Sequence, residues 1–353
     1  MRLIIGAGAV VIILAGIRAT APLLIPIVLA LFLSVTTYPV VKFLQRRGLH
    51  RVIAVTLTML FTLAVLTGPA LLVITAVRQF GATVPQYEAR LRVMVDDLFE
   101  WLRNRDVDTA TLSAVFDPDQ AFGLLVGALS GVATFFSFGF LVVLIASFML
   151  VEAADAAHRP GAKLPYELQQ RFARIAGDMQ TWLWVKTVIS LATGAAAGVW
   201  CAILGIEFAL LWGLTAFLLN YIPNLGSIVA AFPPALLALI EYGPGYAALV
   251  VAGYMAINVL FGNLMEPYLL GRRIGISPLV VLLSVIGWGW MWGVAGMLLS
   301  VPITMLIKMA LEGVPEWRWV ADLMAGGQSA AAAAPSPPAG KTGTADRAVR
   351  QDP

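Results

Sequence analysis

Charged residues are scarce in this sequence. Lysine, arginine, aspartate and glutamate together make up 12% of the 353 residues, whereas 60% are hydrophobic and the mean hydropathy is +0.87. Soluble domains usually carry about 25% charged residues. A soluble chain of this length is excluded, because it could not bury so much apolar surface away from water. Lipid must therefore surround much of the protein.

Residues that commonly carry catalysis or bind metals are equally few. The chain has one cysteine, Cys201, and two histidines, His50 and His158, which do not have metal-ligand spacing. It has no HExxH, paired CxxC or Gly-x-Ser-x-Gly motif. The Gly-Lys-Thr triplet at 340–342 lacks the glycine that a phosphate-binding loop needs five residues earlier, where Pro335 stands. The sequence predicts no enzyme, no metal site and no cofactor.

Apolar runs long enough to cross a bilayer recur along the chain. A spanning helix needs about 20 apolar residues. Such runs lie at about 3–17, 20–41, 52–77, 122–151, 183–205 and 244–263. Two further apolar regions, 207–241 and 277–308, are interrupted by proline and glycine. We predict an all-α integral membrane protein, a polytopic helical bundle of about six full spans plus two interrupted hairpins, with amphipathic helices outside the membrane and eight to ten hydrophobic segments in all.

The distribution of charge predicts which side of the membrane each loop faces. The loop 42–51 carries four basic residues and no acid, whereas 78–121 carries five arginines and eight acids. Cytoplasmic loops are enriched in lysine and arginine. We therefore expect cytoplasmic N- and C-termini and place 78–121 outside. The net charge of +3 comes from basic residues in short loops between apolar runs, which does not indicate nucleic-acid binding.

These assignments divide the chain into six parts. We expect N-terminal membrane spans (1–77), an extracytoplasmic amphipathic helical arm (78–121), a membrane span (122–151), a cytoplasmic amphipathic linker (152–182), a C-terminal membrane transport core (183–312) and a disordered cytoplasmic tail (313–353). Apolar residues recur at helical spacing along the arm (Val84, Tyr87, Leu91, Val95, Leu98 and Leu102) and along the linker (Leu168, Phe172, Ile175, Met179 and Trp182). Such a stripe packs on its own protein or on a sister subunit, or lies in the membrane interface.

Ionisable residues within apolar runs are costly and mark candidate sites. Each costs at least about 2.5 kcal/mol at a bilayer centre unless it is paired or hydrated. Lys186 lies a few residues into a span, where it either reaches the cytoplasmic interface or meets a substrate or a carboxylate. Glu266 stands before Pro267 and is the carboxylate we select for ion coupling. Glu207 and Glu241 fall at the predicted outer ends of 207–241, where interfacial water can solvate them.

The break in 207–241 is itself polar. Residues 220–227 read Asn-Tyr-Ile-Pro-Asn-Leu-Gly-Ser within an otherwise apolar stretch. Pro223 removes a backbone donor and Gly226 permits a turn, so backbone groups are left without helical partners. Such backbone persists at membrane depth only when it is buried in protein or lines a wet cavity. Paired broken segments point to a transport site. The alternative is that each region makes two full crossings joined by an interfacial loop.

Two sets of candidate residues follow. The substrate-binding set is Lys186, Thr187, Ser190, Asn220, Tyr221, Pro223, Asn224, Gly226 and Ser227. The hairpin and hinge positions are Pro267, Gly271, Gly287 and Gly293. Three small-residue motifs, at 123–131, 194–198 and 289–293, place glycines four residues apart and predict close helix packing.

Several of these stretches together resemble a known family. They are KTVISL (186–191), ALLWG (209–213), FLLNYIPNLGS (217–227), NLMEP (263–267), GRRIGISPLV (271–280) and GVAGMLLSVP (293–302). In this order they resemble the autoinducer-2 exporter (AI-2E) family of bacterial inner-membrane proteins. The N-terminal half fits the family only in its layout. Lys186 with Thr187 and Ser190 is similar to the branch that contains the exporter of autoinducer-2.

The resemblance implies export of autoinducer-2 or a similar small polar solute, by a secondary or facilitated mechanism. It also implies a multi-pass inner-membrane protein and a homo-oligomer. Some members of the family are sodium/proton antiporters, so a monovalent cation/proton antiporter with Glu266 as the titrating group is the alternative. A membrane scaffold that transports nothing is the second alternative. Membership in a family determines the fold of a protein better than it determines the substrate.

Overall fold

The computed structural model describes residues 2–105, 123, 127, 139–156, 166–223, 225–270 and 275–325. The longer helices of this part are α1 (Arg2–Ala19), α2 (Ala21–Arg46), α3 (Arg51–Arg103), α6 (Gly139–Ala156), α7 (Tyr166–Ile203), α8 (Ala209–Leu219), α9 (Leu225–Tyr242), α10 (Pro244–Asn258) and α12 (Pro278–Glu312). Shorter elements are a π-helix, η1 (Val259–Met265), α11 (Glu266–Leu270), a 3₁₀ turn (Pro315–Trp317) and α13 (Arg318–Met324). Most of the predicted span 122–151 before Gly139, Asn224, Gly271 and the part of the chain from 326 lie outside the described residues. Within the tail predicted as disordered (313–353), the described part contains the 3₁₀ turn and α13.

Six of the described helical segments are long and apolar enough to cross a membrane. They are Ala21–Arg46, Arg51–Arg103, Gln169–Ile203, Leu225–Tyr242, Pro244–Leu270 and Pro278–Glu312. Strands are absent from the described part of the chain. The prediction of an all-α polytopic membrane protein is confirmed.

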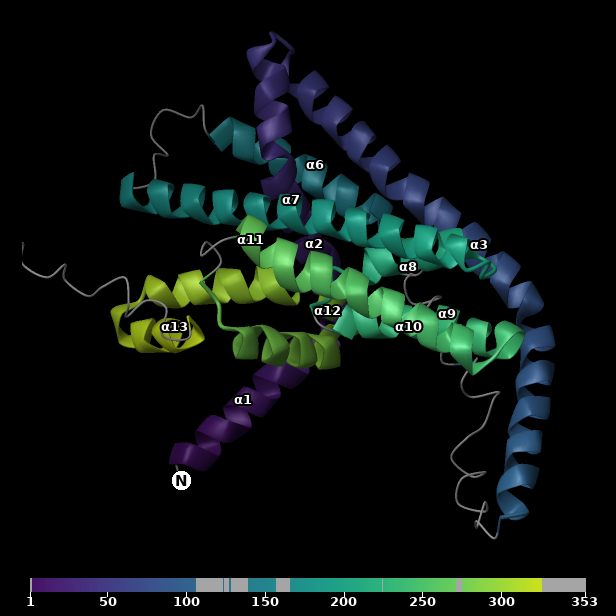
Figure 1. Ribbon diagram of the computed structural model, residues 1–353. Coiled ribbons are helices and arrows are strands. Elements are labelled where there is room, and N and C mark those ends of the chain that lie inside the picture. Colours follow the sequence, from purple (N-terminus) through teal and green to yellow (C-terminus); the bar gives the residue numbers. More distant parts are fainter. Residues whose placement is uncertain are drawn as a thin grey trace, which may run out of the picture.

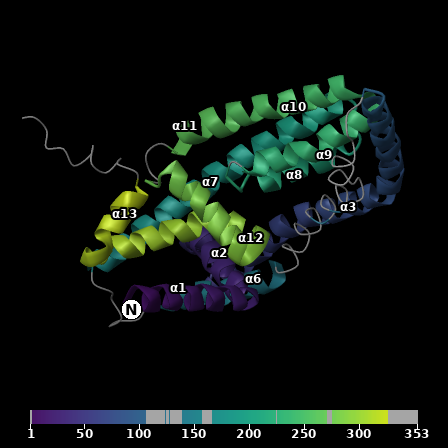
Figure 2. The same ribbon diagram turned by 90° about the horizontal axis from the view of Figure 1, so that it is seen from below.

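The helices form two packed groups that contact each other directly, with α12 in contact with both (Figures 1 and 2). In the first group, α2, α3 and α6 share an apolar cluster around Ala30, Val55 and Ala146. In the second, α7, α8, α9 and α10 pack around Trp212 and Leu237. Helix α12 contacts both α2 and α7, and α2 also contacts α7 directly. Elements of the two groups therefore meet along α2, α7 and α12.

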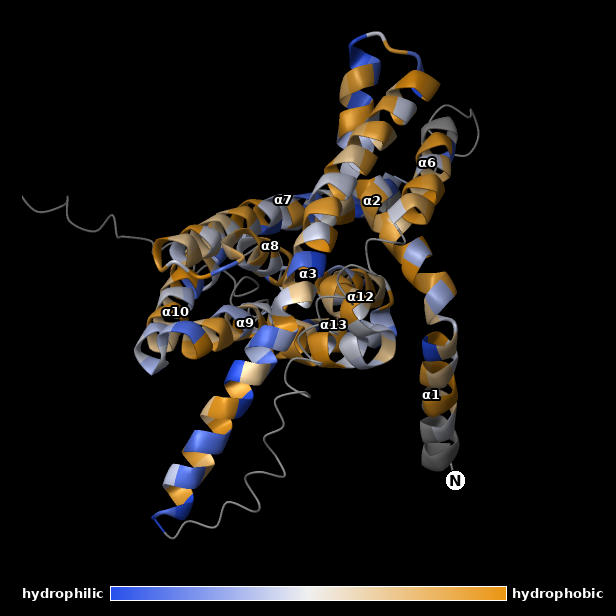
Figure 3. Ribbon diagram, turned by 90° about the vertical axis from the view of Figure 1, so that its right-hand side faces the viewer, coloured by the Kyte–Doolittle hydropathy of each residue, from blue (hydrophilic) through white to orange (hydrophobic). Residues whose placement is uncertain are grey.

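Helix α3 is much longer than a bilayer is thick. Its 53 residues span about 80 Å at about 1.5 Å per residue, against about 30 Å for the hydrocarbon core. The half near Arg51 is mostly apolar, and the far half mixes polar and apolar residues (Figure 3). There Phe80, Val84, Tyr87 and Leu91, spaced four, three and four residues apart, are buried against the second group. Three residues of the predicted stripe, Val84, Tyr87 and Leu91, therefore pack on the protein's own hairpin group, where α3 contacts α8 and α9.

Both interrupted regions fold as helical hairpins. Helices α8 and α9 pack together across the break at 220–224. Helix α8 rises only about 16 Å over its 11 residues, which is half the thickness of the hydrocarbon core. Helix α12 reverses at Gly293, which has φ 61° and ψ −142°, a conformation that favours glycine. A Cβ on Gly296 would overlap the carbonyl oxygen of Trp288, although eight residues of straight helix would separate them by about 12 Å.

Glycines bring α7 and α8 into backbone contact. A Cβ on Gly194 would lie 2.7 Å from the carbonyl oxygen of Gly213, and one on Gly198 would lie 3.4 Å from the Gly213 Cα. The approach at Gly194 requires glycine, whereas a Cβ on Gly198 would be in ordinary van der Waals contact. In the 289–293 motif, a Cβ on Gly289 would lie 2.8 Å from the Met297 side chain in the other arm of the α12 hairpin. The close packing predicted for these two motifs is therefore found within one subunit.

Candidate functional site

One face of α7 carries buried polar side chains within an apolar helix. Lys186, Ser190 and Thr193 lie four and three residues apart, which places them on the same side, and they are 3%, 0% and 5% exposed. Burying a polar group costs free energy unless it is hydrogen-bonded, and burying a charge costs more. The partners of this face therefore define the site.

Lys186 is paired with the carboxylate of Glu266. Its Nζ donates to Glu266 Oε1 at 2.9 Å and to Oε2 at 2.8 Å, so both carboxylate oxygens are engaged. The lysine side chain is 4% exposed and that of Glu266 is 19% exposed. Each charge offsets the cost of burying the other. Of the two roles weighed for Lys186, the contact with a carboxylate is the one seen here.

Local chain geometry explains why Glu266 reaches α7. Pro267 lacks a backbone N–H, so it cannot donate to the carbonyl of Asn263, four residues earlier, and its ring crowds that carbonyl. The chain adopts π-helical turns over Val259–Met265, and the Glu266 N–H donates to the carbonyl of Phe261, five residues back. A π-helical segment changes the direction of the side chains that follow it. Glu266 is the first residue after this segment and contacts α7.

The tip of the α8–α9 hairpin contacts the same face of α7. Asn220 Nδ2 donates to Ser190 Oγ at 3.0 Å, and both residues are buried. Tyr221 Oη donates to Thr187 Oγ1 at 2.8 Å. Together with the ion pair, these bonds join six of the predicted site residues in three pairs, here called the polar network, between α7, the hairpin tip and Glu266.

The remaining residues of the break shape its backbone. Gly226 is buried, and a Cβ there would overlap the carbonyl oxygen of Leu219, so the two arms can meet at this point only through glycine. Pro223 and Ser227 are half-buried beside it. The carbonyl of Pro223 accepts a bond from Leu225 N–H at 2.7 Å, which closes the turn. Asn224 lies outside the described residues.

The hinge candidates occupy different surroundings. Pro267 lies in α11, directly after Glu266. Gly293 is the point at which α12 reverses, whereas Gly287 lies within helical backbone and a Cβ there would meet no atom within 4 Å. Gly271 lies outside the described residues.

Two buried hydroxyls near these elements lack a partner. Thr193 Oγ1 on α7 and Thr304 Oγ1 on α12 are buried without a hydrogen bond. Buried polar atoms are rarely left unpaired, so such a group needs a water or a ligand. Thr193 was absent from the predicted set. Its position three residues after Ser190 is the sequence signal that could have identified it.

Comparison with known proteins identifies the family. The sequence profile of the AI-2E family transporters matches residues 8–316. The chain belongs to the AI-2E transporter family. Among its relatives, the AI-2 transport protein TqsA of Escherichia coli (strain K12) is 39% identical over 326 residues, covering 88% of this chain and 92% of the relative.

Other AI-2E relatives have less specific names. A candidate transport protein of Haemophilus influenzae (strain ATCC 51907) is 35% identical over 324 residues, covering 89% of this chain and 93% of the relative. YhhT of Escherichia coli (strain K12), also named as a candidate transport protein, is 31% identical over 320 residues, covering 88% and 90%. The resemblance drawn from the sequence motifs is confirmed and extends over the N-terminal half. Membership in this family supports a role in transport rather than catalysis. The family match and the candidate spans together support a multi-pass membrane protein.

Proposed function

We propose that this protein exports a small polar solute, autoinducer-2 or a similar signal, across the bacterial inner membrane by a secondary or facilitated mechanism. The observation that carries the proposal is the polar network between α7 and the tip of the α8–α9 hairpin. It joins Lys186 to Glu266, Ser190 to Asn220 and Thr187 to Tyr221. Broken helices that meet polar side chains between membrane helices are the usual construction of a transport site.

The chemistry of the network favours a neutral hydroxylated solute over a bare cation. Hydroxyl and amide groups can exchange their mutual hydrogen bonds for bonds to solute hydroxyls without leaving a buried charge unpaired. The Glu266 carboxylate is already neutralised by Lys186 through both oxygens. The name of one relative, an AI-2 transport protein, supports the same class of solute. An antiporter would need Glu266 to leave Lys186 in order to bind its ion.

We further propose that the arrangement in the membrane follows the charge pattern. We place both termini in the cytoplasm, the arm 78–121 outside, and the transport core at 183–312. We also propose a homo-oligomer on the basis of the family resemblance.

Flux measurements in proteoliposomes test the solute class. Labelled autoinducer-2 and a pH-sensitive dye are followed in parallel, with and without a sodium gradient. We expect solute flux without a sodium-dependent proton signal. A sodium-dependent proton signal without solute flux would overturn the proposal in favour of the antiporter. Absence of both signals in folded, inserted protein would also overturn it and would favour the scaffold.

Variants then connect flux to the network. Neutralising both members of the buried pair, as Lys186→Gln with Glu266→Gln, avoids leaving one buried charge alone, so the protein should fold. We expect strongly reduced solute flux, because the charges that position the α7 face are lost. The matched control neutralises the exposed pair Lys308 and Glu312, whose Nζ and Oε1 are 2.7 Å apart. Equal flux in the two double variants would remove the ion pair from the transport site.

A further inference from the structure

The chain from Thr187 to Met265 contains only two charged residues, Glu207 and Glu241. They lie at the two ends of the α8–α9 hairpin, Glu207 just before α8 and Glu241 in the last turn of α9. From the sequence alone, solvation by interfacial water explained the position of each carboxylate. In the structure both reach one hydroxyl: Tyr87 Oη of α3 is 2.7 Å from Glu207 Oε2 and 2.8 Å from Glu241 Oε1.

Hydrogen counting shows that this arrangement needs an extra proton. A tyrosine hydroxyl has one hydrogen, and an ionised carboxylate can only accept. Tyr87 can therefore donate to one carboxylate but not to both. The second short contact is a hydrogen bond only if that carboxyl group is protonated and donates to the tyrosine oxygen. Two ionised carboxylates on one hydroxyl would leave one contact without a hydrogen and would repel each other.

The surroundings assign the proton to Glu241. Its Oε2 is buried without a hydrogen-bond partner, whereas Glu207 is exposed at the protein surface. A bare buried oxygen is more costly on an ionised carboxylate than on a neutral acid. The chain of bonds therefore runs in one direction: Glu241 Oε1–H donates to Tyr87 Oη, and Tyr87 Oη–H donates to Glu207 Oε2.

Other titratable and charged side chains lie near this proton on the neighbouring helices. Those within five residues of Tyr87 on α3 are Glu88, Arg90 and Arg92; the others near the site are Cys201 on α7 and Tyr254 on α10, which belong to the same apolar cluster, Tyr242 on α9, which follows Glu241, and Tyr246 on α10, which stacks on Tyr242. Tyr242 Oη donates to the Gly205 carbonyl, and Tyr254 Oη contacts Cys201 Sγ at 3.8 Å. The described hydrogen bonds of Glu207 and Glu241 side chains are those to Tyr87.

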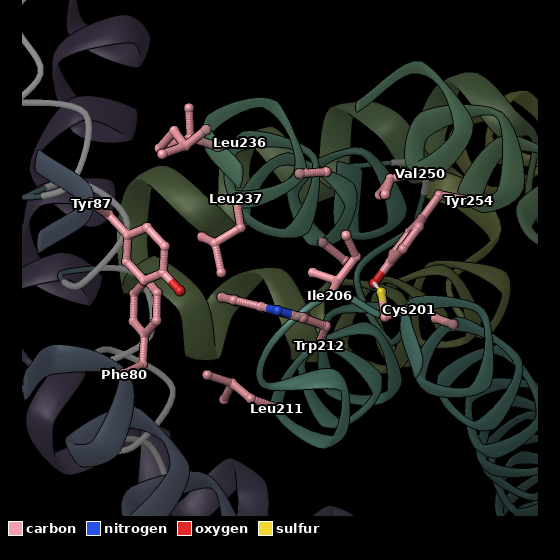
Figure 4. Packing of buried hydrophobic residues seen from close by; sticks show 14 of the residues in the cluster. Phe80, Tyr87, Cys201, Ile206, Leu211, Trp212, Leu236, Leu237, Val250 and Tyr254 are labelled. Carbon is pink, nitrogen blue, oxygen red and sulfur yellow. Dashed lines mark hydrogen bonds between the residues drawn. The ribbon is translucent and has the colours of Figure 1, made fainter. Parts of the chain in front are cut away.

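The shared proton would link two separate parts of the fold. Tyr87 is 5% exposed and stands beside Phe80 on α3, facing Leu237 and Trp212 of the hairpin group (Figure 4). Phe80 stacks edge-on against Trp212 with ring centroids 5.4 Å apart. Apolar contacts thus bring α3 to the hairpin, and the tyrosine bonds add a polar link at this interface.

We propose that Tyr87, Glu207 and Glu241 form a proton-binding site that fastens α3 to the α8–α9 hairpin when one proton is bound. As the pH rises the proton leaves Glu241 for water, the Glu241–Tyr87 bond loses its hydrogen, and two negative charges remain on one hydroxyl. The contact between α3 and the hairpin then weakens. The site does not depend on which solute the protein carries.

Infrared spectra of the full-length protein in liposomes test for the proton directly. We expect a protonated-carboxyl C=O band that disappears as the pH is raised and that is missing in Glu241→Gln. The control is Glu88→Gln, which removes the carboxylate next to Tyr87 in sequence and should keep the band. A band that survives in Glu241→Gln, or no such band in the wild type, would overturn the proposal.

Hydrogen exchange across α3 tests the mechanical consequence. The exchange rate of peptides covering 80–91 is divided by the rate of the same peptides in the unfolded protein, which removes the intrinsic effect of pH. This ratio should rise roughly tenfold or more at alkaline pH, as loss of a charge-assisted hydrogen bond predicts. Tyr87→Phe should exchange fast at every pH. Glu241→Gln should exchange slowly at every pH, because its amide N–H can donate to Tyr87 permanently. The same exchange at acidic and alkaline pH in the wild type, or an unchanged pH dependence in Glu241→Gln, would refute the link.

Discussion

Removing one member of the buried ion pair should be far more damaging than removing both. Glu266→Gln leaves the Lys186 ammonium, whose side chain is 4% exposed, without its carboxylate. Breaking a buried pair by removing one partner typically costs about 3–5 kcal/mol, because an uncompensated charge remains. The two contacts of 2.8 and 2.9 Å and the 19% exposure of Glu266 place this pair in that class.

The chain provides its own reference for this estimate. Lys308 and Glu312, one helical turn apart on α12, are 2.7 Å apart with side chains 14% and 46% exposed. Exposed pairs at this spacing are worth about 0.3–0.5 kcal/mol. We therefore expect Glu312→Gln to lower the free energy of unfolding by less than about 1 kcal/mol. Glu266→Gln should lower it several-fold more.

A double-mutant cycle measures the coupling. The free energy of unfolding is determined in mixed detergent micelles for the wild type, Lys186→Gln, Glu266→Gln and the double variant. The double variant should be more stable than either single variant, with a coupling energy toward the upper end of the range of about 0.5–3 kcal/mol seen for residues in contact. Additive losses, or a Glu266→Gln loss no larger than that of Glu312→Gln, would refute the reasoning.

Two further predictions concern the hairpin tip. Gly226→Ala should destabilise the protein and abolish flux, because the new methyl group overlaps the Leu219 carbonyl oxygen. Gly287→Ala is the control and should be neutral or slightly stabilising, because a Cβ there meets no atom within 4 Å. Unfolding and flux assays compare the two variants, and similar behaviour would contradict the tight turn. Asn220→Ala should cost about 1–3 kcal/mol by leaving the buried Ser190 hydroxyl without this partner, and adding Ser190→Ala should recover part of that loss in the same assay. No recovery would show that the two residues act separately.

The sequence specified the helical segments and most of the network members, because both follow from local patterns. Apolar length predicts spans, and proline with glycine predicts the breaks. Lys186 and Glu266 were each selected as costly charges within or beside apolar runs. Their pairing was not predictable, because it depends on how a π-helical segment directs the side chain of Glu266, 80 residues from Lys186, toward α7.

Other features depended on backbone angles or on contacts distant in sequence. Gly287 and Gly293 were equivalent as hinge candidates, and only the φ of 61° at Gly293 distinguishes the reversal from continuous helix. Glu207 and Glu241 were interpreted separately as interfacial carboxylates. A shared tyrosine hydroxyl on a helix more than 100 residues earlier could not be inferred from either one.

The backbone contact between α7 and α8 limits how this protein can move. Where Gly194 and Gly198 touch Gly213, no side chain separates the helices that could adopt another rotamer and let them slide. Helix α7 and the first arm of the hairpin should therefore travel as one rigid unit, and the bonds from Asn220 and Tyr221 to α7 can keep their lengths during that motion. Any displacement that alternately opens the network to the two sides of the membrane would then take place along the seams with α2, α3 and α12, where side chains rather than backbones meet.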